Sequence, residues 1–500
     1  MSEEIENTES KSSYRSIFKA TSLFGGIKVY QIFIQVIKSK LVAVLLGPTG
    51  IGIQGLLTSA TQLVKGITSL GLSQSAVRDI SEANGTGDNY RISKTVTVLQ
   101  NLVWATGFLG MLIIMIFSRR ISNVTFGNED YTLPFIFLSV TLLIDQLSAG
   151  RMVVLQGLRR LKHLAKASAI GSTIGLIVSV PLYYFFGVKG IVPTLILNSV
   201  TSLTIAWLYA RKIKIKKTNV TPKETIQCGK GMLKMGFAMC MSTALVMAAS
   251  YILRGYIRSQ AGTDAVGLYV AGFTIISSYV DMIFSAISTD YYPRLAAVSR
   301  DNPKMKKIVN QQGEIASLIL TPLLLVCIFF MPLILHLLYS SKFIEANDYV
   351  IFASLGMMFK LSAWLMSFQF VAKGDSKLFI INETFTNIYF LIFNLLGYKL
   401  AGLRGLGIAF AISYAIYAVQ VFIISHKRYG FSFSWQFMRL YIPQLFIVCL
   451  SLFIVMVLKK SFFFYLIGCL ILALSTGFSV KELDKRMGLL SFIKNKLKHE

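Results

Sequence analysis

Long apolar segments recur along almost the whole of the 500-residue chain, separated by short polar connections. Crossing the hydrocarbon core of a bilayer takes about 17–25 predominantly apolar residues. Segments of that length lie at 20–46, 51–72, 96–118, 132–156, 166–186, 190–210, 233–256, 266–290, 314–338, 347–371, 378–399, 404–425, 438–458 and 461–479. The pattern predicts an all-α, polytopic membrane protein with about fourteen transmembrane helices.

The connections between these segments are too short to hold a soluble domain, the longest being residues 211–231. The N-terminal tail, residues 1–16, is polar and acidic, whereas a secretory signal begins with basic residues and continues with an apolar stretch. We therefore expect the first apolar segment to be retained as a helix. The function should lie inside the membrane or at its edge.

Composition supports this interpretation. Apolar residues make up 54% of the chain and charged residues 15%, whereas soluble proteins carry about 25% charged residues. The five cysteines and four histidines lack the spacing of a metal site, and no phosphate-binding loop of the GxxxxGK[ST] kind is present in the sequence. We expect neither a metal nor another cofactor, and no enzymatic activity.

The net charge of +27 is distributed unevenly over the connections. With the N-terminus in the cytoplasm, the inner connections carry roughly three times as many lysines and arginines as the outer ones, as the positive-inside rule requires. We therefore predict that both termini are cytoplasmic. The basic charge is assigned to these connections and to an anionic substrate, and no nucleic acid partner is expected.

A glycine-rich motif precedes three of the predicted helices and begins at Gly47, Gly262 and Gly402. The first two copies recur six helices apart with the same polarity, which predicts two six-helix halves in parallel orientation around a central cavity. Two further helices follow. The predicted segments are a cytoplasmic tail at 1–16, lobes at 17–217 and 218–430, an extra helix pair at 431–480 and a basic cytoplasmic tail at 481–500.

Polar residues form stripes along several predicted helices. Packing between helices explains serines and threonines in such stripes, but it explains lysines poorly. We therefore predict a water-filled path lined by helices one, two, seven and eight, with Thr61 and Ser285 in one cavity. The predicted cavity-lining residues are Gln31, Gln35, Thr58, Thr61, Gln62 and Ser285.

Charged residues within the spans suggest two roles. Basic residues are suited to an anionic substrate, and we assign this role to Lys28, Lys38, Lys65, Arg254, Arg258 and Lys360. Neither Lys28 nor Lys65 has an acid three or four residues away on its own helix, so a bound anion would best neutralise them. Acidic residues can carry a proton or another cation, and the candidates are Asp145, Asp281 and Glu383.

For these acids the alternative is a structural ion pair or a protonated, hydrogen-bonded carboxyl group. Lys360 and Glu383 lie on neighbouring helices, but the rise of about 1.5 Å per residue places them at different depths. A direct pair between them is therefore left open.

Several segments resemble Wzx-type flippases of O-antigen and other lipid-linked oligosaccharides. This family is the polysaccharide-transporter branch of the multidrug/oligosaccharidyl-lipid/polysaccharide exporter superfamily. The resemblance covers roughly residues 15–427. The segments that carry it are Lys40–Gly52, Phe126–Tyr131, Leu337–Phe343, Phe359–Lys373 and Phe379–Glu383.

The resemblance implies a V-shaped pair of six-helix lobes around a cationic cavity, in the bacterial inner membrane. The implied substrate is an undecaprenyl-diphosphate-linked oligosaccharide, an O-antigen or similar repeat unit of lipopolysaccharide, moved to the periplasmic leaflet by alternating access. Coupling to protons or sodium, contact with membrane lipid, and polymerase and chain-length partners are expected with it. Lys40, Lys360 and Glu383 match positions expected to be charged, whereas Lys28, Lys38 and the C-terminal extension depart from the family.

Three rival functions compete with this one. A drug or cation antiporter of the same superfamily would favour acids over bases in its cavity, because its substrates are cationic. A flippase for the peptidoglycan lipid precursor is a sibling that the quoted segments fit less well. A glycan polymerase or ligase would be expected to carry a long outer loop, and the longest outer connection, near residues 119–131, is too short.

Overall fold

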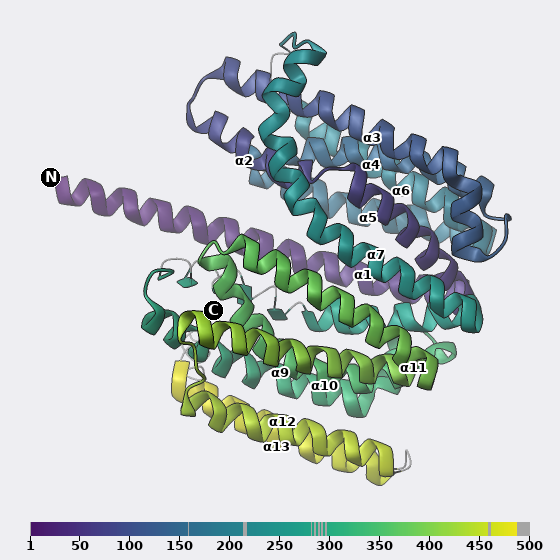
Figure 1. Cartoon of the computed structure of the whole chain (residues 1–500), viewed down its shortest axis with the longest axis vertical. Helices are drawn as coiled ribbons and strands as arrows, with labels where there is room; N and C mark the ends of the chain where they lie inside the picture. Colours follow the sequence, from purple (N-terminus) through teal and green to yellow (C-terminus); the bar gives the residue numbers. More distant parts are fainter. Residues whose placement is uncertain are drawn as a thin grey trace. The chain divides into compact units, whose positions relative to one another are not determined.

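A computed structural model describes residues 2–487 except 159, 214–217, 282, 285–286, 289–290, 292–293, 296–297 and 459–461. Within this part of the chain every regular element is a helix (Figure 1). Nine of the described helices are long and apolar enough to cross a membrane. The predicted all-α, polytopic fold is confirmed, while the count of fourteen helices stays a prediction.

The chain divides by packing into two compact units, residues 1–266 and residues 267–500. The helix repeat in the sequence predicts instead that the first lobe ends at residue 217. Those lobe boundaries stay a prediction, and the two units are described separately below.

Unit 1 consists of long helices and a few short connecting elements. In chain order these are α1 (Ser2–Thr68), α2 (Leu72–Gly85), α3 (Asn89–Phe126), α4 (Thr132–Gly157), α5 (Leu161–Phe186), the 3-10 helix η1 (Gly187–Gly190), α6 (Ile191–Arg211) and α7 (Pro222–Thr274), whose last residues belong to unit 2. Helix α4 packs against α3 and α6, and α5 packs against α1 and α6.

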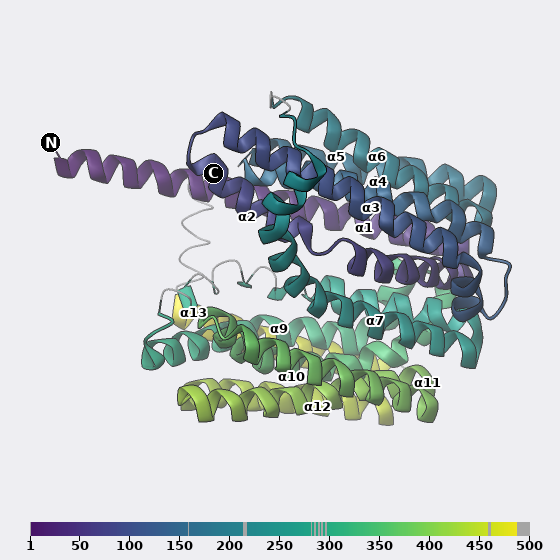
Figure 2. The same ribbon diagram turned by 45° about the horizontal axis from the view of Figure 1, so that its top comes forward.

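Unit 2 begins with the end of α7 and a π-helix. Its elements are the π-helix η2 (Ile275–Val280), α9 (Asn302–Leu338), the 3-10 helix η3 (Ser341–Ala346), α10 (Asn347–Ala372), α11 (Ser376–Tyr429), α12 (Trp435–Val457) and α13 (Phe462–Met487). Helix α10 packs against α9 and α11, and α12 and α13 both pack against α9 (Figure 2). The C-terminal helix pair is therefore anchored on α9, where Phe329 contacts Phe464 of α13.

The three glycine motifs mark breaks inside the longest helices. Gly47 divides α1, with φ 66° and ψ −171°, and Gly262 divides α7, with φ 79° and ψ −176°. Gly402 divides α11, with φ 55°. A positive φ strains residues that carry a Cβ atom, so glycine is needed at these points. The similar backbone angles at Gly47 and Gly262 support the repeat inferred from the sequence.

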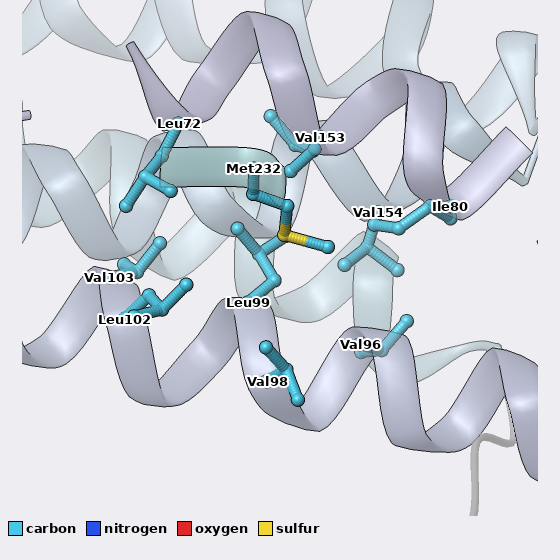
Figure 3. Packing of buried hydrophobic residues seen from close by; sticks show 11 residues of the cluster. Leu72, Ile80, Val96, Val98, Leu99, Leu102, Val103, Val153, Val154 and Met232 are labelled. Carbon is cyan, nitrogen blue, oxygen red and sulfur yellow. The ribbon is translucent and has the colours of Figure 1, made fainter. Parts of the chain in front are cut away.

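Helix α2 is an element that the hydropathy pattern did not predict. It is too short to span a membrane, and its residues read as a polar connection in the sequence. Leu72, Ala76 and Ile80 are fully buried and share one face of the helix. They pack against α3, α4 and α7 in a cluster completed by Val96, Val98, Leu99, Leu102, Val103, Val153, Val154 and Met232 (Figure 3).

Backbones make close contact where α7 crosses the junction between α1 and α2. A Cβ atom on Gly236 would lie 2.2 Å from the carbonyl oxygen of Leu70. A Cβ atom on Gly71, which also has a φ of 61°, would lie 2.1 Å from the carbonyl oxygen of Gly236. Backbone atoms cannot move aside as a flexible side chain can, so the crossing requires glycine in both helices.

We predict that Gly236→Ala lowers the melting temperature of the purified protein, because the added methyl group separates α7 from the α1–α2 junction. The matched control is Gly231→Ala on the same helix, where no atom lies within 4 Å of the added Cβ. The control should be neutral or stabilising by up to about 1 kcal/mol, since alanine favours a helix over glycine. Thermal unfolding followed by size-exclusion chromatography measures both. Equal melting temperatures would contradict the close crossing.

Candidate functional site

Unit 1 holds an ion pair between two of its long helices. The ammonium of Lys65, in the last turn of α1, donates to a carboxylate oxygen of Asp145 on α4 at 2.9 Å. The two side chains are 37% and 32% exposed. Lys65 has no acidic partner on its own helix, as the sequence indicates. The expectation that a bound anion would best neutralise it is wrong, because Asp145 of another helix does so. Lys65 and Asp145, assigned to different roles from the sequence, lie side by side.

Unit 2 holds a second, more buried ion pair. The ammonium of Lys360 on α10 donates to both carboxylate oxygens of Asp281 at 2.6 and 2.7 Å. Asp281 directly follows the π-helix η2, a type of helix often found at functional sites. The side chains are 17% and 29% exposed. The same ammonium lies 5.5 Å from the ring centroid of Phe284 and 5.6 Å from that of Tyr414. The open question of a Lys360–Glu383 pair is answered, because Lys360 pairs with Asp281.

The two pairs occupy matching places in their units. Asp145 and Lys360 are equally far along α4 and α10 from the first residues of those helices. Lys65 follows the Gly47 break at almost the same distance as Asp281 follows the Gly262 break. The second unit thus repeats the ion pair of the first with acid and base exchanged.

Glu383 belongs to a separate polar cluster on the two segments of α11. Its carboxylate accepts a hydrogen bond from the Tyr417 hydroxyl at 2.8 Å. The neighbouring Asn382 accepts from Gln420 at 2.7 Å. Tyr414, Tyr417 and Gln420 are not among the site residues predicted from the sequence. Neighbours in this set are three positions apart, which places them on one side of the helix, and this spacing is the signal that would have found them.

Arg254 and Arg258 contact the backbone of other helices in unit 1. Arg254 donates to the carbonyl oxygen of Gly55 at 2.9 Å, and Arg258 donates to that of Phe126. These bonds join α7 to α1 and to the end of α3. Each guanidinium group therefore uses at least one N–H donor to join two helices.

The remaining sequence candidates divide into three groups. The hydroxyls of Thr58 and Thr61 donate to carbonyl oxygens of their own helix, at Gln54 and Leu57, and Gln62 is exposed. Ser285 lies outside the described residues, as does the side chain of Lys28. The predicted cavity shared by Thr61 and Ser285 stays a prediction.

Gln31, Gln35 and Lys38 come together with residues of three other helices around a cavity inside unit 1. Its volume is about 350 Å³. It lies among α1, α4, α5 and α6, and Ser168, Ser172, Asn198 and Ser202 contribute to its lining. Among the residues that the structure describes, no group of three or more histidines, cysteines or acids is arranged to hold a metal.

Comparison with known proteins identifies the family. Residues 41–348 match the model of a family described as polysaccharide biosynthesis proteins. The chain belongs to this family. It is also 20% identical over 424 residues to the lipid III flippases of Escherichia coli K12 and Shigella flexneri, covering 83% of this chain and all of each relative.

Solved structures show the same fold. The lipid II flippase MurJ in an inward closed conformation has a TM-score of 0.67 at 14% identity and covers 94% of this chain and 99% of its own. An inward-facing multidrug resistance transporter of the MATE family has a TM-score of 0.65 at 16% identity, over 80% and 94% of the two chains. The family match confirms the resemblance to polysaccharide transporters inferred from the sequence, and the solved structures confirm the fold that it implies.

We predict that Lys360→Ala destabilises the protein more than Lys65→Ala does. Removing one partner of a fully buried ion pair costs about 3–5 kcal/mol, because it leaves an uncompensated charge, and a half-exposed partner is solvated more easily. The double variant Lys360→Met with Asp281→Asn should recover most of the melting temperature. A double variant as unstable as Lys360→Ala would contradict this electrostatic account.

Proposed function

We propose that this protein is a flippase that moves an undecaprenyl-diphosphate-linked oligosaccharide, an O-antigen or similar repeat unit, from the cytoplasmic to the periplasmic leaflet. The observation that carries the proposal is the presence of one lysine–aspartate pair between helical segments of each unit, Lys65 with Asp145 and Lys360 with Asp281. The relationship to lipid III flippases over their whole length supports it.

A diphosphate is a dense anion, and lysine is among its natural partners in proteins. Lys65 is the better placed of the two lysines to receive it, since both members of its pair are about one-third exposed. In this proposal the diphosphate takes the place of the Asp145 carboxylate beside the ammonium. The substrate therefore exchanges one counter-ion for another, and the lysine is never left alone in the membrane.

The exchange also suggests a means of coupling. Once the diphosphate replaces it, the Asp145 carboxylate is a charge without a partner, and uptake of a proton or another cation neutralises it. We assign the same function to Asp281 when Lys360 is engaged. Glu383, bound to a tyrosine hydroxyl rather than a base, is the third candidate for binding a proton or sodium.

A peptidoglycan-precursor flippase is the alternative that specific observations favour, because MurJ covers almost the whole chain at a TM-score of 0.67. Both candidate substrates carry a diphosphate, so the lysines cannot distinguish between them. The two substrates differ in their glycan. A drug antiporter would need carboxylates available for a cation, whereas Asp145 and Asp281 are paired with lysines. The lipid-linked oligosaccharide that accumulates in cells lacking the protein identifies the substrate.

We place the protein in the bacterial inner membrane, with both termini in the cytoplasm and its product delivered to polymerase and chain-length partners. For topology we predict that a cysteine replacing Asp130 reacts with an impermeant maleimide added outside spheroplasts, while one replacing Thr86 reacts only after lysis. Both positions are exposed. The native cysteines are replaced first. The reverse labelling pattern would overturn the orientation.

For transport we predict that Lys65→Ala reduces surface polysaccharide in a deletion strain about ten- to a hundredfold, because a hydrogen bond to a charged group contributes about 1.5–3 kcal/mol. Lys65→Arg should retain part of the export, since the charge survives while the geometry changes. Lys65→Glu should be the worst, because it repels the diphosphate. Membrane levels measured by blot accompany each variant.

A double variant separates substrate binding from simple neutralisation. Lys65→Ala combined with Asp145→Asn removes both charges, so no unpaired carboxylate remains. If Lys65 binds the substrate, export stays low in the double variant although its membrane level is normal. Recovery of export would show that Lys65 serves only to neutralise Asp145, and the proposed mechanism would be wrong at this residue.

A further inference from the structure

The cavity inside unit 1 has an unusual set of polar groups. It is lined by one ammonium, three carboxamides and three hydroxyls, and no carboxylate is among its lining residues. The polar members are Lys38, Gln31, Gln35, Asn198, Ser168, Ser172 and Ser202. Its volume of about 350 Å³ is at the lower end for pockets that hold small molecules, about 300–1,000 Å³.

Lys38 differs from the two paired lysines. Lys65 and Lys360 each contact an aspartate, whereas no described carboxylate lies beside the Lys38 ammonium. Lys38 lies within the predicted first span, where an unneutralised charge costs at least a few kcal/mol. An anion in the cavity would remove that cost.

Asn198, on α6, is a second group in the cavity that is only half satisfied. Its amide nitrogen donates to the Ser179 hydroxyl at 3.2 Å. Its side-chain oxygen is buried and accepts from no described group. Gly175 lies in front of this oxygen, since a Cβ there would come within 3.1 Å of it. A ligand that satisfies Asn198 must therefore donate a hydrogen bond.

Charge and hydrogen bonding together define the ligand. One lysine among neutral groups matches a single negative charge, whereas a diphosphate carries more. The Asn198 oxygen requires a hydroxyl or amide donor on the same molecule. We propose that this cavity binds a monoanionic sugar of the hexuronate class, with its carboxylate on Lys38 and a hydroxyl on Asn198.

Such a sugar has two sources, a unit of the transported oligosaccharide or a free sugar acid. The first rests on the proposed flippase function, and the second does not. Both share the chemistry of a carboxylate beside hydroxyls. The composition of the lipid-linked oligosaccharide that accumulates without the protein distinguishes them: a hexuronate in it assigns the cavity to the substrate, and its absence assigns the cavity to a free acid.

Binding is tested on the purified full-length protein by calorimetry with glucuronate, glucose and acetate. Glucuronate should bind at least tenfold more tightly than either of the others, because only it offers both the charge and the hydroxyls. Lys38→Gln should weaken glucuronate binding at least tenfold. Asn198→Leu should weaken glucuronate but leave acetate unchanged.

The matched control is Lys166→Gln, which removes one positive charge from an exposed position on α5 that does not line the cavity. It should bind glucuronate as the wild type does. Absence of glucuronate binding, or binding that Lys38→Gln leaves unchanged, would overturn the proposal. Because the measurement involves no transport, its result stands apart from the outcome for Lys65.

Discussion

A charge inside a bilayer must be neutralised, and the arrangement of both units reflects this constraint. Lys65 of α1 forms a neutral pair with Asp145 of α4, and Lys360 of α10 forms one with Asp281, which follows η2. Because the pairs lie at matching places after the Gly47 and Gly262 breaks, the repeat extends from backbone turns to side-chain chemistry. Helix spacing and break positions must be kept for the pairs to meet.

The exchange of acid and base between the two pairs has an energetic consequence. The net free energy of burying an ion pair is close to zero, because the Coulomb attraction between the two charges offsets their loss of hydration. In the proposed mechanism, a substrate anion has only to compete with one carboxylate and does not have to dehydrate a free lysine. In unit 1 the base, Lys65, lies on the segment of α1 that follows the Gly47 break. In unit 2 the residue at the corresponding place is an acid, Asp281, which follows η2. Under the proposed mechanism, the base of unit 1 would receive an anion and the acid of unit 2 a cation.

The sequence predicted features that leave a local signal. Apolar length predicts the spans, and Gly47, Gly262 and Gly402 predict the breaks because positive φ strongly favours glycine. Helix α2 was missed because a 14-residue amphipathic helix is shorter than any span. The ion pairs were missed because Lys65 and Asp145 lie on different helices, and periodicity along one helix says nothing of the neighbour's register. Gln31, Gln35 and Lys38 line one cavity, but the sequence of the first helix carries no signal for the helices α4, α5 and α6 that close it.

The contrast between the paired lysines and Lys38 is therefore informative about function. Helix packing places an acid beside Lys65 and Lys360, and the same fold provides carboxamides, hydroxyls and open space beside Lys38. A Cβ atom on Gly171, which lines that space, would have its nearest neighbour, in the Ile205 side chain, at 4.0 Å, so a larger residue could begin to fill the cavity without a clash. Close packing is the normal state of a protein interior, and a polar space kept open beside a cation with no described counter-ion is costly in stability. Such a cost is accounted for when a ligand, and not the protein, supplies the missing anion.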